Sequence, residues 1–291
     1  MNSFSLKGID AKLVSKIMNS EYVFSEEIEY LAKIEEFHGE KNTLTYATNK
    51  EYTQKAVEIG YKFIFVKPEN VLEVEGVNFL ESEYPRESFV KLVNYLNSNK
   101  HYENIKSSMG ENTKFGKNVE ISENVQIGNN VEIGNNVVIH ENVIIEDNVK
   151  IGNFCVLGSK GYDVSLLEDQ LVYSGVHGGL YIGKNCIIRN FVNIDSSVWG
   201  QNTKISQNVS IDSNVLIGHD VNLSENVSVR GGSVISGFSK IGKNTIIGVK
   251  TVITQRSEVG ENCLITAGSI ISKKYPDNSK IISLAPKVQK L

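Results

Sequence analysis

The stretch NVEISENVQIGNNVEIG, residues 118–134, repeats one pattern every six residues. Val119, Val125 and Val131 are each followed by an isoleucine two places later. The spacing runs on to Leu157, returns at Cys186, and continues to the end of a long second tract that spans residues 203–271. A short fixed period is typical of a solenoid, in which each repeat packs against its neighbours. A coiled coil is excluded because its period is seven.

Two branched aliphatic residues separated by one residue suit a short strand whose first side chain points inward. Asparagine often precedes the inward residue, and asparagine tolerates the positive φ that a sharp corner requires. Three strands and three corners make a coil of about 18 residues, and successive coils stack about 4.8 Å apart through parallel hydrogen bonds. The sequence therefore predicts a mainly β fold with a parallel β-helix over residues 106–272.

The remaining segments lack the repeat. Within residues 1–105, SLKGIDAKLVSKIMN, NKEYTQKAVEIG and PRESFVKLVNYLNS have helical spacing, whereas NTLTYAT and YKFIFVKP are typical of strands, which predicts a small α/β domain. Residues 159–179 break the period and predict an inserted loop that projects from a corner, either as a functional arm or as a tolerated insertion. Residues 273–291 are predicted to form a C-terminal tail beyond the solenoid.

Composition narrows the classes of function. The chain has 291 residues, 40% of them hydrophobic, and a net charge of −4, so bulk charge favours neither nucleic acid nor an anionic membrane as a partner. No apolar run is long enough to span a membrane and the first residues do not resemble a signal peptide, so we expect a cytoplasmic protein. Cys155, Cys186 and Cys263 fall on inward repeat positions, which predicts buried thiols rather than disulfides or zinc ligands.

The histidines are the residues most able to carry chemistry. His140 and His219 differ by 79 positions, which is not a multiple of the coil length, so we expect them on different edges and expect no metal site. His219 is predicted at a corner, and one coil further along the chain lies Gly237. An imidazole can accept a proton near neutral pH, and a bare glycine N–H can stabilise an oxyanion. The alternative is a surface histidine without a catalytic role.

The repeat resembles that of the hexapeptide-repeat acyltransferases, which implies a left-handed parallel β-helix and a homotrimer with active sites in the grooves between neighbouring helices. VLIGHDVNLSENVSVRGGSVISGFSKIG, residues 215–242, further resembles the active-site stretch of the UDP-3-O-acylglucosamine N-acyltransferases of lipid A synthesis. This resemblance implies that His219 is the catalytic base, that Asp212 orients or polarises it, and that Gly237 supplies the oxyanion N–H. GGLYIGKNCIIRNFVNID matches as well and places Asp195 at a substrate-binding position.

LTYATNKEY resembles the uracil-binding segment of the same family, in which two aromatic rings clasp the base and an asparagine bonds its edge. Carried over, these residues are Tyr46, Tyr52 and Asn49; without the resemblance they would be part of a strand-to-helix turn. His177, in the inserted loop, is a further candidate for substrate binding.

The C-terminal segment is basic, and its lysines are candidates for contacts with the phosphates of coenzyme A or with an acidic carrier protein; solvated surface lysine is the alternative. These candidates are Lys273, Lys274 and Lys287. The family's second functional histidine is replaced near Arg256, the asparagine beside its aspartate is Ser213, and no counterpart of its carrier-docking helical segment follows.

These features predict an N-acyltransferase that moves an acyl group from acyl-CoA or acyl carrier protein to the amino group of a UDP- or dTDP-linked sugar, for cell-surface glycan synthesis. One alternative is the lipid A reaction itself, with an acyl carrier protein as donor. The other is a trimeric scaffold that binds a nucleotide sugar without catalysis.

Overall fold

The computed structural model describes residues 6–34, 42–102, 105–167, 170–173, 175, 178–199 and 201–282. The chain divides into two compact units. The first comprises Met1–Asn104 together with Tyr162–Gly178 and Val198–Gln201, and the second comprises Ile105–Gly161, Gly179–Ser197 and Asn202–Leu291. The predicted inserted loop is therefore grouped with the N-terminal segment rather than with the coils. None of the described helices is both long and apolar enough to cross a membrane.

The first unit is built on a four-stranded parallel sheet in the order β1-β2-β3-β4. Every side chain of β3 is buried, as in a parallel sheet covered on both faces, and helices α2 and α3 both contact β2 and β3. The insertion contributes an antiparallel hairpin, β14 with β15. The elements are α1 Ala11–Met18, β1 Tyr30–Leu31, β2 Thr43–Ala47, α2 Lys50–Ile59, β3 Phe63–Val66, the 3-10 turn η2 Pro68–Asn70, β4 Asn78–Glu81, α3 Pro85–Ser98, β14 Val164–Leu167 and β15 Gln170–Tyr173.

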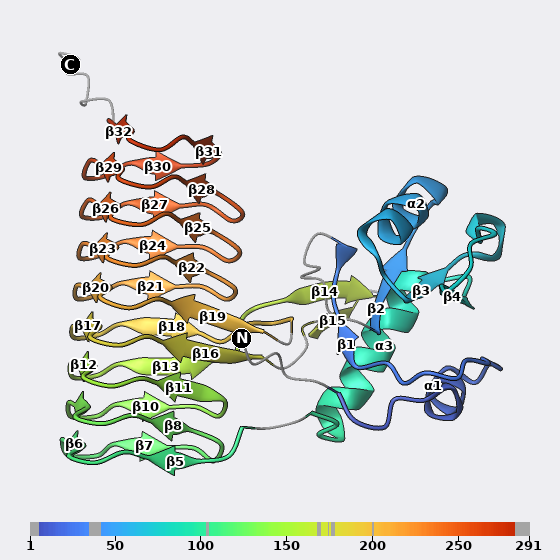
Figure 1. The fold of residues 1–291 in the computed structure, drawn as a ribbon, viewed down its shortest axis with the longest axis horizontal. Helices are drawn as coiled ribbons and strands as arrows, with labels where there is room; N and C mark the ends of the chain where they lie inside the picture. The colour runs from blue at the N-terminus through green and yellow to red at the C-terminus, as the bar shows by residue number, and fades with distance from the viewer. Residues whose placement is uncertain are drawn as a thin grey trace. The chain divides into compact units, whose positions relative to one another are not determined.

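The second unit is a parallel β-helix of three sheets, and Figure 1 shows its coils stacked from β5, β6 and β7 up to β31 and β32. The chain passes from sheet 1 to sheet 2 to sheet 3 and then back to sheet 1 one coil higher. Sheet 1 contains β5 Ser108–Met109, β8 Gln126–Ile127, β11 Val143–Ile145, β16 Gly179–Ile182, β19 Asn202–Ile205, β22 Asn222–Leu223, β25 Lys240–Ile241, β28 Glu258–Val259 and β31 Lys274–Tyr275. Sheet 2 contains β6 Lys114–Phe115, β9 Glu132–Ile133, β12 Lys150–Ile151, β17 Ile187–Ile188, β20 Ser210–Ile211, β23 Ser228–Val229, β26 Ile246–Ile247, β29 Leu264–Ile265 and β32 Lys280–Ile281. Sheet 3 contains β7 Glu120–Ile121, β10 Val138–Ile139, β13 Val156–Ser159, β18 Asn193–Asp195, β21 Leu216–Ile217, β24 Val234–Ile235, β27 Val252–Ile253 and β30 Ile270–Ile271.

The coil length confirms the predicted spacing, with two exceptions. Partners in successive coils are 18 residues apart, as for Val138 and Val156, but 37 apart from Asn148 to Asn185 and 23 apart from Asn185 to Asn208. The two longer steps contain the segments that belong to the first unit. Strands β31 and β32 continue the stacking beyond residue 272, where the sequence predicts the solenoid to end.

The interior changes along the axis. Valine, isoleucine and cysteine fill the lower coils, and all three cysteines are free and buried as predicted. In the upper coils the first inward residue is often serine or threonine, and its hydroxyl donates to a corner carbonyl, as from Ser233 to Gly248 (3.0 Å) and from Thr245 to Gly260 (2.9 Å). These hydroxyls are fully buried, so the hydrogen bonds offset the cost of taking them from water.

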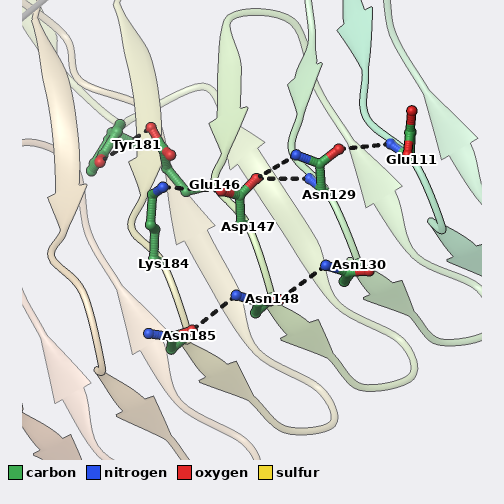
Figure 2. A network of polar contacts seen from close by, with 9 residues as sticks. All are labelled: Glu111, Asn129, Asn130, Glu146, Asp147, Asn148, Tyr181, Lys184 and Asn185. Carbon is green, nitrogen blue, oxygen red and sulfur yellow. Dashed lines mark hydrogen bonds and ion pairs between the residues drawn. The ribbon is translucent and has the colours of Figure 1, made fainter.

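The corner between sheets 1 and 2 carries an asparagine ladder. Each residue has positive φ, and its Nδ2 donates to the Oδ1 of the asparagine one coil on, over 2.9–3.3 Å. The ladder contains Asn112, Asn130, Asn148, Asn185, Asn208, Asn226, Asn244 and Asn262. Figure 2 shows three of its members beside a second chain of contacts, in which the Asn129 N–H and the Lys184 ammonium bond Asp147 and lower the pKa of its carboxyl.

Candidate functional site

His219 lies at the corner between sheets 3 and 1, after β21 and before β22. The Phe238 N–H donates to the His219 carbonyl (3.0 Å), so the coil above sits in register on this corner. A methyl group added to Gly237 would lie 2.7 Å from His219 Cε1 and 2.8 Å from Nε2. The structure thus places the bare glycine against the imidazole, as the 18-residue coil predicts.

A carboxylate that the sequence analysis did not single out holds the imidazole. Asp220 Oδ2 lies 3.0 Å from His219 Nδ1, and the two side chains are only 12% and 11% exposed. The Ser197 hydroxyl donates to Asp220 Oδ1, and the Asp220 N–H donates to Thr203 Oγ1 at 2.8 Å. A carboxylate at Nδ1 favours the tautomer with its proton there, which leaves the Nε2 lone pair on the side of Gly237.

Asp212 does not occupy the position expected for it. It follows β20, at the corner between sheets 2 and 3, whereas His219 lies at the next corner of the same coil. Its carboxylate accepts the Ser213 N–H (2.8 Å) and lies 3.4 Å from Arg189 Nη1. Within this chain Asp220, and not Asp212, therefore orients His219.

The two insertions also correct two expectations that were based on counting residues. His140 follows β10 and His219 follows β21, and both strands belong to sheet 3, so the two histidines share one edge, three coils apart. Ser197, rather than the residue 18 positions before His219, lies beside Asp220 because that coil is longer. Among the residues that the structure describes, no group of three or more histidine, cysteine, aspartate or glutamate side chains could hold a metal ion.

Two side chains above His219 complete this corner. The Phe238 ring meets the imidazole edge-on, with centroids 5.0 Å apart, and the Arg256 guanidinium lies 4.9 Å over the Phe238 ring. Asp220, Phe238 and Arg256 are successive members of one column with positive φ, each 18 residues after the last. Counting in steps of 18 from Asp220 would have found both residues from the sequence.

Asp195 ends β18, on the same sheet as β21 and one coil below it. Its Oδ1 accepts hydrogen bonds from the Ser159 hydroxyl (2.7 Å) and from Asn193 Nδ2 (2.8 Å). The carboxylate is half-buried. Asp195 therefore lies on the edge that carries His219, in a fixed orientation.

The nucleotide-binding candidates lie around β2 and the start of α2. The half-buried Tyr46 packs its ring on Phe89, with centroids 5.2 Å apart. Asn49 caps α2, since its Oδ1 accepts the Tyr52 N–H at 2.9 Å. Tyr52 is 41% exposed. The cap occupies the oxygen of Asn49, a structural role that the sequence analysis did not assign to it.

The basic candidates are only partly described. Lys274 is paired with Glu258 at 2.9 Å, and the Lys273 ammonium lies 5.7 Å from the Tyr275 ring centroid. Lys274 lines an open groove of about 590 Å³ on the outer face of sheet 1, which runs from β22 to β31. Lys287 and His177 lie outside the described residues.

Comparison with known proteins identifies the repeat. A family model described as bacterial transferase hexapeptide (six repeats) matches residues 106–141 and 124–159, and one described as hexapeptide repeat of succinyl-transferase matches residues 240–273. No curated protein sequence matches the chain.

Among solved structures, a UDP-N-acetylglucosamine acyltransferase from Campylobacter jejuni is 28% identical with a TM-score of 0.53, and the match covers 58% of this chain and 64% of that one. The match therefore spans less than two thirds of the Campylobacter protein. LpxA from Acinetobacter baumannii is 23% identical with a TM-score of 0.54, over 60% of this chain and 68% of that one, a likeness of fold. The chain belongs to the hexapeptide-repeat proteins and carries the left-handed parallel β-helix of this acyltransferase class.

Proposed function

We propose that the protein is an acyltransferase that moves an acyl group from a thioester to the amino group of a nucleotide-linked amino sugar. The observation that carries this proposal is the corner at His219, where a carboxylate holds Nδ1 and a bare glycine faces Nε2. The 28% identity to the Campylobacter acyltransferase supports acyl transfer to a nucleotide sugar in general.

In the proposed reaction, His219 Nε2 takes a proton from the acceptor nitrogen as that nitrogen attacks the thioester carbonyl carbon. The Gly237 N–H, which donates to no described residue, stabilises the oxyanion of the tetrahedral intermediate. The C–S bond then breaks, and the leaving thiolate takes the proton from the imidazolium. General-base and oxyanion contributions of this type are each worth roughly 10²–10⁴ in rate.

The acceptor and the donor are assigned to different features. We propose that the base of the nucleotide, from UDP or dTDP, lies against Tyr46 and Tyr52, and that Asn49 Nδ2 donates to a carbonyl on its edge. Asp195 binds the sugar on the edge below His219. The pantetheine arm of coenzyme A or of an acyl carrier protein lies in the groove over β22–β31, with its phosphate near Lys273 and Lys274.

The nearest alternative is transfer from acyl carrier protein in the lipid A pathway, which the resemblance to its N-acyltransferases keeps open. A non-catalytic trimeric scaffold is the third possibility, and the packed contacts around His219 count against it. Assays that offer UDP- and dTDP-linked amino sugars with either short acyl-CoA or long-chain acyl carrier protein separate the three. The corresponding N-acetylated sugars test a hydroxyl acceptor.

Replacing His219 tests the proposal directly. We expect His219→Gln to lower kcat at least about 100-fold with little change in KM, because the general base is lost and the binding surfaces remain. His140→Gln is the matched control, since His140 lies on the same edge three coils away. Near-normal turnover by His219→Gln, or equal losses in both variants, would reject the assignment.

A further inference from the structure

Ser197 lies where both segments of the first unit interrupt the β-helix. It is the last residue before Val198–Gln201, and its N–H donates to the carbonyl of Gly179 (3.0 Å), the first residue after Tyr162–Gly178. Ser197 is only 3% exposed. Its backbone is therefore fixed at the junction of the two insertions.

Asp220 is held from both flanks of the second insertion. Ser197, before it, donates its hydroxyl to Asp220 Oδ1, and Thr203, after it, accepts the Asp220 N–H at 2.8 Å. The other carboxylate oxygen contacts His219 Nδ1. The position of the imidazole thus depends on residues at the two ends of a segment that itself belongs to the first unit.

Within the first unit, Trp199 joins the aromatic side chains next to the nucleotide candidate. Its ring lies 5.8 Å from Phe89, which packs on Tyr46 at 5.2 Å. The Lys33 ammonium lies 4.7 Å from the Trp199 ring centroid, and the indole is 4% exposed. Only Val198 separates this anchored ring from Ser197 in the chain.

We infer that the connector formed by Ser197, Val198 and Trp199 positions the His219–Asp220 pair and makes its alignment depend on the packing at Tyr46. Ser197 is a positioning residue that acts through Asp220, and Trp199 is its anchor in the first unit. A base that packs on Tyr46 stabilises the Phe89–Trp199 arrangement, and the two covalent bonds to Ser197 carry that constraint to the carboxylate. This inference rests on the proposed function.

A double-mutant cycle tests the first step. We expect Ser197→Ala to lower kcat at least about tenfold with KM unchanged, the size expected for losing a hydrogen bond to a charged group. In the Asp220→Asn background the same substitution adds less than about twofold, because its effect passes through that carboxylate. Full activity of Ser197→Ala, or additive losses in the cycle, would overturn the role of Ser197.

The anchor is tested by Trp199→Ala with Trp199→Phe as the matched control, since phenylalanine keeps an aromatic ring against Phe89. We expect Trp199→Ala to lower kcat about tenfold at saturating substrates, while the dissociation constant of UDP changes by less than about threefold. In that background Ser197→Ala has little further effect, and Trp199→Phe recovers most of the activity. Loss of UDP affinity with unchanged kcat would show that Trp199 serves binding alone and would contradict the inference.

Melting temperatures of all variants identify any that fail to fold, and Trp199→Phe and Ser197→Ala, the mildest changes, then decide the outcome. His219→Gln separates this inference from the function beneath it. Turnover by His219→Gln sinks the proposed function, whereas an inactive His219→Gln beside a fully active Ser197→Ala sinks only the connector.

Discussion

At the residue scale, Gly237 is the position where one added methyl group has the clearest consequence. The new Cβ would lie 2.7–2.8 Å from the His219 ring, closer than any ordinary contact, so the imidazole must move away from its productive position. We expect Gly237→Ala to lower kcat about 100-fold or more while the melting temperature changes little. Gly231→Ala is the control, because its nearest neighbour would be 3.3 Å away. A fully active Gly237→Ala would contradict the site.

Cys186 offers a pH-dependent test of the core. Burial raises the pKa of this thiol from its ordinary value of 9.0 to about 11. The folded state therefore holds the proton more tightly, so stability is complete below pH 9 and falls as the pH rises to about 11, by about 2 kcal/mol. Urea unfolding at pH 8 and pH 10.5 should show this loss in the wild-type protein relative to Cys186→Ala. An equal loss in both proteins would exclude the thiol as its source.

Which site residues the sequence reveals depends on what lies between them. Gly237 is one uninterrupted coil from His219, so the repeat period alone brings the two together. Ser197 could not be found by counting, because a coil of 23 residues separates the two strands that place it beside Asp220. Asp220 was overlooked in favour of Asp212, since the family resemblance pointed to the latter and no periodicity describes an adjacent contact.

At the element scale, the asparagine ladder makes a testable contribution to the stability of the β-helix. Asn226 has φ 60°, accepts an amide hydrogen bond from Asn208 (3.2 Å) and donates one to Asn244 (2.9 Å). We expect the free energy of unfolding to fall by about 1 kcal/mol in Asn226→Gly, more in Asn226→Ala and most in Asn226→Val. Glycine loses only the hydrogen bonds, whereas alanine and valine also strain the left-handed conformation. Urea midpoints in any other order would show that the corner conformation is not what asparagine supplies.

The repeat is also the reason that the β-helix was predictable and the insertion was not. Each coil writes the same inward and corner residues, so the pattern states both the strand and the turn many times over. Residues 159–179 have no such repetition, and the hairpin of Val164–Leu167 with Gln170–Tyr173 depends on its surroundings in the first unit. The two-residue strand Tyr30–Leu31 was missed for the same reason, since an edge strand of that length carries no period.

At the scale of the whole molecule, the outer face of sheet 3 predicts how copies of the chain associate. Its outward positions form an apolar column that includes Leu216, Val252 and Ile270, which are 41%, 38% and 71% exposed. The outward positions of sheet 1 in the same coils are polar or charged, such as Lys240 and Glu258. Because His219 lies at the edge of sheet 3, three copies that meet on this face would place each His219 beside a neighbouring subunit.

We therefore expect the wild-type protein to have three times the chain mass of 32.3 kDa in solution and Val252→Lys to dissociate, because an unpaired ammonium at a packed interface is costly. Light scattering after size exclusion measures the mass, and activity should fall with the trimer and recover as protein concentration rises. Leu264→Lys is the matched control, since Leu264 is also 41% exposed but lies on sheet 2. Dissociation by Leu264→Lys and not by Val252→Lys would move the interface to sheet 2, and with it would remove the reason to expect a subunit boundary at His219.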